Sequence, residues 1–124
     1  MIDTHHMLVD RHCSVVTVTL NRPEQRNALS LPLMLELTQV LLLIGSSDAR
    51  GVILAANGPV FSAGHHFADM ADHSHDEVRA LFRICTEMMD CLQALPQPVV
   101  ARVHGLATAA GCQLVATCDL AVAA

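Results

Sequence analysis

Residues 104–124, HGLATAAGCQLVATCDLAVAA, decide how the rest of the chain is interpreted. The apolar, β-branched run at residues 99–103 precedes them and predicts a short buried strand. Gly105 permits a sharp turn, and small residues from 107 to 111 begin a helix pattern. A strand, a tight turn and a helix start leave backbone N–H groups free to bind an anion, or an oxygen that gains negative charge. A close-packed turn without a ligand fits this pattern equally well.

The composition indicates one apolar domain, or a piece of a larger one. The chain has 124 residues, of which 52% are hydrophobic and 15% are charged, with a formal net charge of −5. All 7 basic residues are arginines, and they form no cluster. There is no Trp or Tyr on which bases could stack. These features argue against nucleic acid as a partner.

No sequence feature predicts a membrane span, a disulfide or a metal site. The longest apolar run, residues 40–45, is far too short to cross a bilayer. The polar start of the chain resembles neither a secretory signal nor a transit peptide, so we expect a cytoplasmic protein, with the mitochondrial matrix as the alternative. The 5 cysteines include no C-x-x-C pair and are interpreted as small core residues in a reducing compartment.

Hydrophobic periodicity predicts strands that alternate with helices. Strand patterns cover residues 7–10, 15–20, 52–56, 99–103 and 120–123, and helical patterns cover residues 30–44, 74–95 and 109–117. A polar loop is expected at 21–27 and a short helical piece near 67–70. Ser30 caps the first long helix, and Ser74 with Glu77 forms a capping box for the second. The order β-β-α-β-α-β-α-β predicts an α/β fold.

The second long helix carries an apolar face with a period of 3.6 residues. Its members are Val78, Leu81, Phe82, Cys85, Met89, Leu92 and Leu95. The last predicted strand ends at the final residue, so we expect residues 1–124 to be the N-terminal part of a single domain whose C-terminal part is absent. The faces around Leu41 and Leu92 and the final strand would then lack partners, and the chain would not fold as a stable monomer.

Three motifs occur in order along the chain: LNRPEQRNAL at 20–29, FSAGHHF at 61–67, and HGLA with GCQL and CDLA between 104 and 121. Together they resemble the enoyl-CoA hydratase/isomerase (crotonase) family. The resemblance covers the whole chain, but only the N-terminal half of a typical family domain. It implies the ClpP/crotonase spiral of β-β-α repeats, here truncated, and assembly into homotrimers or hexamers. It also implies that coenzyme A is bound as part of a thioester substrate, not as a separate cofactor.

By position, the resemblance assigns the family's oxyanion hole to the backbone N–H groups of His65 and Ala110. These groups would hold the thioester oxygen while an enolate develops. The adenine end of coenzyme A would lie near Ala63, and Arg22 with its loop near the pantetheine and the phosphates. The remaining residues implied in substrate binding are Gly64, His66, Phe67 and Ala68.

The chain also departs from the family pattern. Gln113 stands where the family's first catalytic Glu falls, as in those hydratase-domain members that have Gln there. An amide does not exchange a proton near neutral pH, so it cannot be a general acid or base. The second catalytic Glu would fall beyond residue 124. Ala109 and Ala110 replace a Gly–Gly pair, and His104 stands where Asn is common.

Several polar residues have two interpretations. His65 and His66 form no metal pair, because adjacent side chains diverge and no carboxylate stands at ligand spacing. His104 is either a replacement acid/base or a hydrogen-bonded histidine at a strand end. Asp69 and Asp72 either approach the substrate or lie at a solvated helix end.

Two functions therefore remain open. The first is a lyase- or isomerase-type enzyme of fatty acid and acyl-CoA metabolism that stabilises a thioester enolate, with hydratase activity weak or lost. The second is a non-catalytic acyl-CoA-binding or assembly module. Gln113 favours the second function, whereas the three motifs favour the first.

Overall fold

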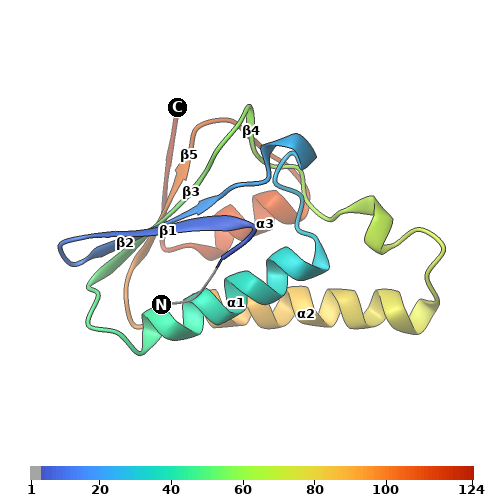
Figure 1. Ribbon diagram of the computed structural model, residues 1–124, viewed down its shortest axis with the longest axis horizontal. Coiled ribbons are helices and arrows are strands. Elements are labelled where there is room, and N and C mark those ends of the chain that lie inside the picture. Colours follow the sequence, from blue (N-terminus) through green and yellow to red (C-terminus); the bar gives the residue numbers. More distant parts are fainter. Residues whose placement is uncertain (1–3) are drawn as a thin grey trace.

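The computed structural model describes residues 4–124, and a five-stranded sheet forms its centre (Figure 1). The strand order is β1-β2-β3-β5-β7. Only β1 and β2 pair antiparallel, and the other neighbours are parallel. The predicted α/β class is therefore confirmed. The bounds are β1 (Met7–His12), β2 (Val15–Leu20), β3 (Gly51–Ala56), β5 (Val99–Val103) and β7 (Leu120–Ala123).

A second, parallel sheet pairs β4 (Val60–Ser62) with β6 (Leu106–Ala107). These strands are not predictable from the sequence pattern, because two or three residues are too few to show a period of two. The expected polar loop contains a 3-10 helix, η1 (Pro23–Gln25). The short helical piece expected near residue 67 is confirmed as η2 (Phe67–Asp69).

The three long helices lie within two residues of their predicted ends. They are α1 (Leu31–Gly45), α2 (His75–Gln93) and α3 (Ala110–Thr117). The Ser30 hydroxyl accepts from the N–H of Leu33, and the Ser74 hydroxyl accepts from the N–H of Glu77. The Glu77 carboxylate returns a contact to the Ser74 hydroxyl, at 3.1 Å. Within residues 4–124, no helix is both long and apolar enough to cross a membrane.

The core lies between the sheet and the pair α1 and α2, which run side by side (Figure 1). The expectation that the helix faces around Leu41 and Leu92 are open is wrong, because each helix covers the other and these side chains are 1% and 3% exposed. The buried stripe of α2 also differs from the predicted one. Phe82 is 45% exposed, because one residue of helix turns a side chain about 100° away from the stripe. The stripe consists of Leu81, Cys85, Met88 and Leu92.

Strand β7 lies at the edge of the sheet and is exposed along its length, with Leu120 66% and Val122 62% exposed. Asp119 fixes its start. The Asp119 carboxylate accepts from the N–H of Val99 at 2.7 Å, and its own N–H donates to the Val99 carbonyl at 2.9 Å. One acidic side chain therefore sets the register of β7 on β5.

Candidate functional site

The segment after β4 meets the start of α3 backbone to backbone. Gly64 has φ +92°, and a Cβ placed on it would lie 3.3 Å from the backbone N of Ala110 and 3.1 Å from the Cβ of Ala109. A Cβ on Gly111 would collide with the carbonyl oxygen of Ser62. Small residues are required here because the two segments touch through their main chains.

Two peptide planes in this contact are oriented by hydrogen bonds on their carbonyl sides. The Gly64 carbonyl accepts from the N–H of Leu29 at 2.6 Å, and the Ala109 carbonyl accepts from the N–H of Gln113 at 3.1 Å. A trans peptide is planar, so the N–H groups of His65 and Ala110 point the opposite way. Among residues 4–124, neither N–H donates to a protein acceptor. The two free donors therefore lie on adjoining segments with fixed directions.

The turn into α3 holds Ala109 in an unusual conformation. Its φ is 51° and its ψ is −125°, a region that glycine enters far more easily than alanine. Such a backbone costs on the order of 1–3 kcal/mol and persists only where its surroundings impose it. Here Ala109 is the N-cap of α3 and makes no side-chain cap bond. The strain therefore lies next to one of the two free donors.

A cavity of about 500 Å³ opens beside these donors, between α2 and α3. An adjoining cavity of about 330 Å³ continues along the same two helices. Gln113 lines both cavities, and of the residues that the structure describes, no carboxylate or arginine lines either one. The first is lined by His65, Phe82, Cys85, Thr86, Ala109, Ala110 and Gln113, and the second adds Met89, Gln93, Ala116 and Thr117.

The His65 side chain is half-buried at this cavity. Its ring meets the Phe82 ring edge to face, with centroids 5.1 Å apart and planes at 82°. Its Nδ1 is buried and has no hydrogen-bond partner among the described residues. Burial lowers the pKa of His65 below its ordinary value, and the Leu29 backbone and the Asp69 carboxylate offset this only in part. The imidazole is therefore neutral at pH 7.

Asp69 holds the start of α1. Its carboxylate accepts from the N–H of Leu31 at 2.8 Å, which satisfies an orphan donor of the first helical turn. Neither sequence interpretation of Asp69 anticipated this bond, because the two residues are 38 positions apart. Asp72 is exposed, with φ +59°, and lines neither cavity.

The loop of Arg22 lies beside Ala63, whose N–H donates to the Arg26 carbonyl at 3.0 Å. Asn27 organises this loop and is 0% exposed. Its side chain accepts from the N–H of Arg22 and donates to the carbonyls of Asn57 and Val60. In the sequence, Asn27 is visible only as one member of the 20–29 motif, because its burial and its three hydrogen bonds depend on the folded loop.

The residues expected to bind coenzyme A form two groups. His65 and Ala110 line the cavity together with Gln113, and Gly64 packs against Ala109 and Ala110 without lining it. Arg22, Ala63, His66, Phe67 and Ala68 do not line it. The Arg22 side chain lies 3.3 Å from the Glu24 carboxylate, and Phe67 is 82% exposed.

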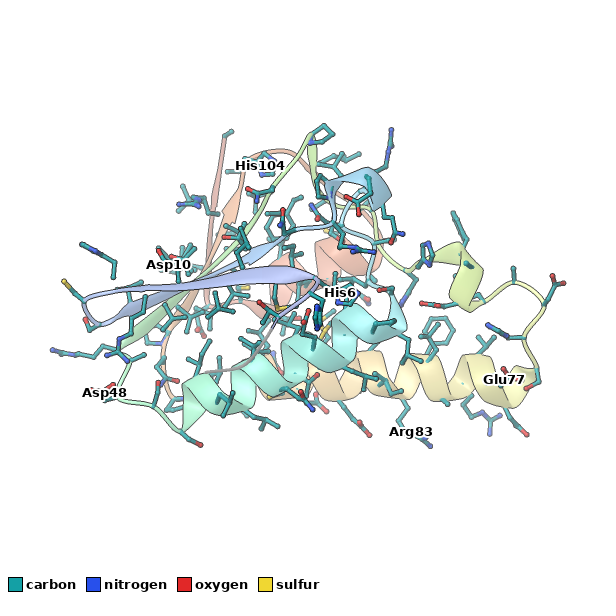
Figure 2. The ribbon with its side chains drawn as sticks, in the orientation of Figure 1. His6, Asp10, Asp48, Glu77, Arg83 and His104 are labelled. Carbon is teal, nitrogen blue, oxygen red and sulfur yellow. The ribbon has the colours of Figure 1, made fainter. Side chains whose placement is uncertain are left out.

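His104 lies outside the cavity, near the turn that follows β3 (Figure 2). A ring nitrogen of His104 bonds to the Gly58 carbonyl, which confirms the interpretation as a hydrogen-bonded histidine at a strand end. Over residues 4–124, no three His, Cys, Asp or Glu side chains gather as a metal-binding group.

Comparison with known proteins identifies the family and the fold of the chain. The family model described as enoyl-CoA hydratase/isomerase matches residues 10–124. The crystal structure of an enoyl-CoA hydratase from Mycobacterium smegmatis superposes with a TM-score of 0.94 at 49% identity, over 97% of this chain and 48% of that one. Human enoyl coenzyme A hydratase domain-containing protein 3 gives a TM-score of 0.92 at 38% identity, over 96% and 48%.

A curated relative from Xenopus laevis is named enoyl-CoA hydratase domain-containing protein 3, mitochondrial. It is 47% identical over 108 residues, which are 86% of this chain and 37% of that protein. The chain therefore belongs to the enoyl-CoA hydratase/isomerase family, and its crotonase fold is confirmed. It spans about half or less of the length of these relatives.

Proposed function

We propose that this chain binds an acyl-CoA thioester with the carbonyl oxygen between the N–H groups of His65 and Ala110. The observation that carries the proposal is the pair of free, fixed N–H donors beside the cavity. Developing enolate charge on the oxygen is stabilised by both donors. In a comparable oxyanion hole, removal of one donor costs about 3–4 kcal/mol of transition-state stabilisation.

The position of the thioester oxygen determines where the acyl group and the coenzyme A portion of the substrate lie. The acyl group occupies the cavity between α2 and α3, where Phe82 supplies apolar surface and Thr86 and Gln113 supply neutral polar groups. The coenzyme A portion leaves along Ala63 toward Arg22, one of the two arginines of the neighbouring loop at residues 21–27. These positions support a role in acyl-CoA and fatty acid metabolism.

The proposal includes a hydratase activity of this chain that is weak or lost. Addition of water needs a group that activates the water and a group that delivers a proton, and each contributes roughly 10²- to 10⁴-fold. Gln113 provides neither group, and no carboxylate from residues 4–124 lines the cavity. The same observation favours the second candidate, a non-catalytic acyl-CoA-binding or assembly module of the family.

Calorimetry on the 124-residue chain tests the binding proposal. Butyryl-CoA is titrated against coenzyme A and ADP, which lack the thioester carbonyl. We expect butyryl-CoA to bind more tightly than either control. Equal affinities for all three would count against the paired-donor site, and rapid hydration of crotonyl-CoA would contradict the weak-hydratase proposal.

A homo-oligomer, trimeric or hexameric, is part of the same proposal. Exposed apolar residues on β7 and on α1, where Leu42 is 60% and Leu43 54% exposed, support assembly. Light scattering after gel filtration measures the mass, and a monomer with a cooperative melt would contradict it.

For location, the word mitochondrial in the name of the Xenopus relative supports the matrix alternative over the cytoplasm. Cell fractionation with an antibody against the native protein would distinguish the two compartments.

A further inference from the structure

His65 brings two groups to the cavity from one residue. Its backbone N–H is one of the two free donors, and the residue lines the cavity together with Ala110 and Gln113. Its Nδ1 is buried and makes no hydrogen bond of good geometry among the described residues, although the Leu29 backbone acts on the ring and favours its protonated form. A bound acyl group can therefore meet the ring only through the part that lines the cavity.

The covalent geometry of one residue limits where its ring can act. If the thioester oxygen is bound by the His65 N–H, the α-carbon of the acyl group lies only two bonds from that oxygen. An imidazole attached through the same Cα is then within reach of the hydrogens on that carbon. Reacting atoms about 3–3.5 Å apart are the condition for a productive encounter.

We propose that the His65 imidazole removes and returns the α-proton of the bound acyl group, a task for which Gln113 is chemically unsuited; this rests on the proposed function. The Cα–H bond breaks and the proton moves to an imidazole nitrogen. The electron pair forms the enolate C=C bond, and the carbonyl electrons move to the oxygen held by the two N–H groups. Return of a proton to the α-carbon restores the thioester, so no oxidant or co-reactant is needed.

The surroundings keep the imidazole in its basic form. Burial is the main influence on the ring and favours its neutral state. From α2, Cys85 faces the cavity as a neutral thiol, because burial raises its pKa. From α3, Gln113 is uncharged. Among residues 4–124, the one carboxylate acting on the ring is Asp69 of η2, which accepts from the N–H of Leu31 and stabilises the imidazolium once it forms.

Exchange of the α-hydrogens of butyryl-CoA for deuterium tests the proposal. The 124-residue chain is incubated with butyryl-CoA in D₂O, and mass spectrometry measures the deuterium gained. In His65→Gln the backbone N–H remains and only the proton-transfer group is lost. We expect its exchange rate to fall about 10²-fold or more, with butyryl-CoA affinity changed less than threefold. His75→Gln, a substitution at the exposed start of α2, should exchange like the wild type.

A second measurement does not depend on any variant. The wild-type exchange rate should rise with pH through an inflection below the ordinary histidine pKa of 6.5 and then level off. The pKa of His65 measured by NMR should match that inflection.

The outcomes separate the two proposals. No butyryl-CoA binding overturns both of them. Binding without exchange, or exchange that is unchanged in a folded His65→Gln, overturns only the role of the imidazole. An inflection that does not match the His65 pKa overturns it as well.

Discussion

Gly64 and Ala110 approach so closely that a Cβ on Gly64 would lie 3.3 Å from the Ala110 nitrogen, while Gly64 itself has φ +92°. Both the backbone conformation and the contact disfavour a side chain there. The free N–H groups of the site are held together by this approach.

Gly64→Ala is therefore expected to lower the free energy of unfolding by about 1–3 kcal/mol and to weaken butyryl-CoA binding. Urea unfolding and calorimetry measure the two effects. Gly51→Ala in β3 is the matched control, because its Cβ would meet only atoms at 4.0 Å. If both variants had the same stability, the close approach would not restrict position 64.

Ala109→Gly is expected to stabilise the chain by about 1 kcal/mol, because glycine adopts φ 51° without the steric cost of a Cβ. In the exposed helical control, Ala116→Gly, the same chemical change should destabilise by about 0.5–1 kcal/mol. Thermal or urea melts compare the two. A loss of stability in both variants would contradict the strain assigned to Ala109.

Gln113→Glu is expected to raise crotonyl-CoA hydration at least about tenfold with little change in binding, because one acid–base group usually contributes 10²- to 10⁴-fold. The rate is followed by the loss of enoyl-CoA absorbance. Gln93→Glu adds the same charge to the adjoining cavity only, and it should leave the rate unchanged. An unchanged rate in Gln113→Glu would show that residue 113 does not occupy the acid–base position.

The lowered pKa of His65 makes stability depend on pH. Between the folded pKa and the unfolded value of 6.5, the unfolded chain binds more protons at this residue. The free energy of unfolding should therefore rise with pH through that window, and this contribution is lost as the pH falls. Urea midpoints from about pH 5 to 8 should show a flatter profile in His65→Gln than in the wild type. Identical slopes would mean that burial does not disfavour the charged ring.

The sequence allowed the strands of the large sheet and the long helices to be located, because each carries at least one full period of apolar residues. The order of the strands in the sheet was not predicted. Ser30 and Ser74 cap their helices as expected. The strands β4 and β6 escaped prediction because they are two or three residues long and pair residues more than 40 positions apart, such as Val60 with Leu106. Leu41 and Leu92 were expected to lack packing partners, but both are buried. The apolar stripe of a helix does not show in the sequence which other helix covers it.

At the site, the motifs led to His65, Ala110 and Gln113, which the structure brings to one cavity. The orientation of the N–H groups was not readable from the motifs. It depends on hydrogen bonds from Leu29 and within α3, and the conformation of Ala109 depends on the same contacts. The bond from Asp69 to Leu31 was missed for a similar reason, since it joins side chain to backbone across the fold.

The bond between the Leu29 N–H and the Gly64 carbonyl links the site to a distant part of the chain. Leu29 is followed directly by Ser30, the cap of α1, so a substitution that shifts this helix end would also change the orientation of the peptide plane between residues 64 and 65. A random-mutagenesis screen for ligand affinity would therefore recover substitutions in the first turn of α1. Such variants would keep every cavity-lining residue unchanged. They would differ from the wild type only in how firmly the orientation of the His65 N–H is held.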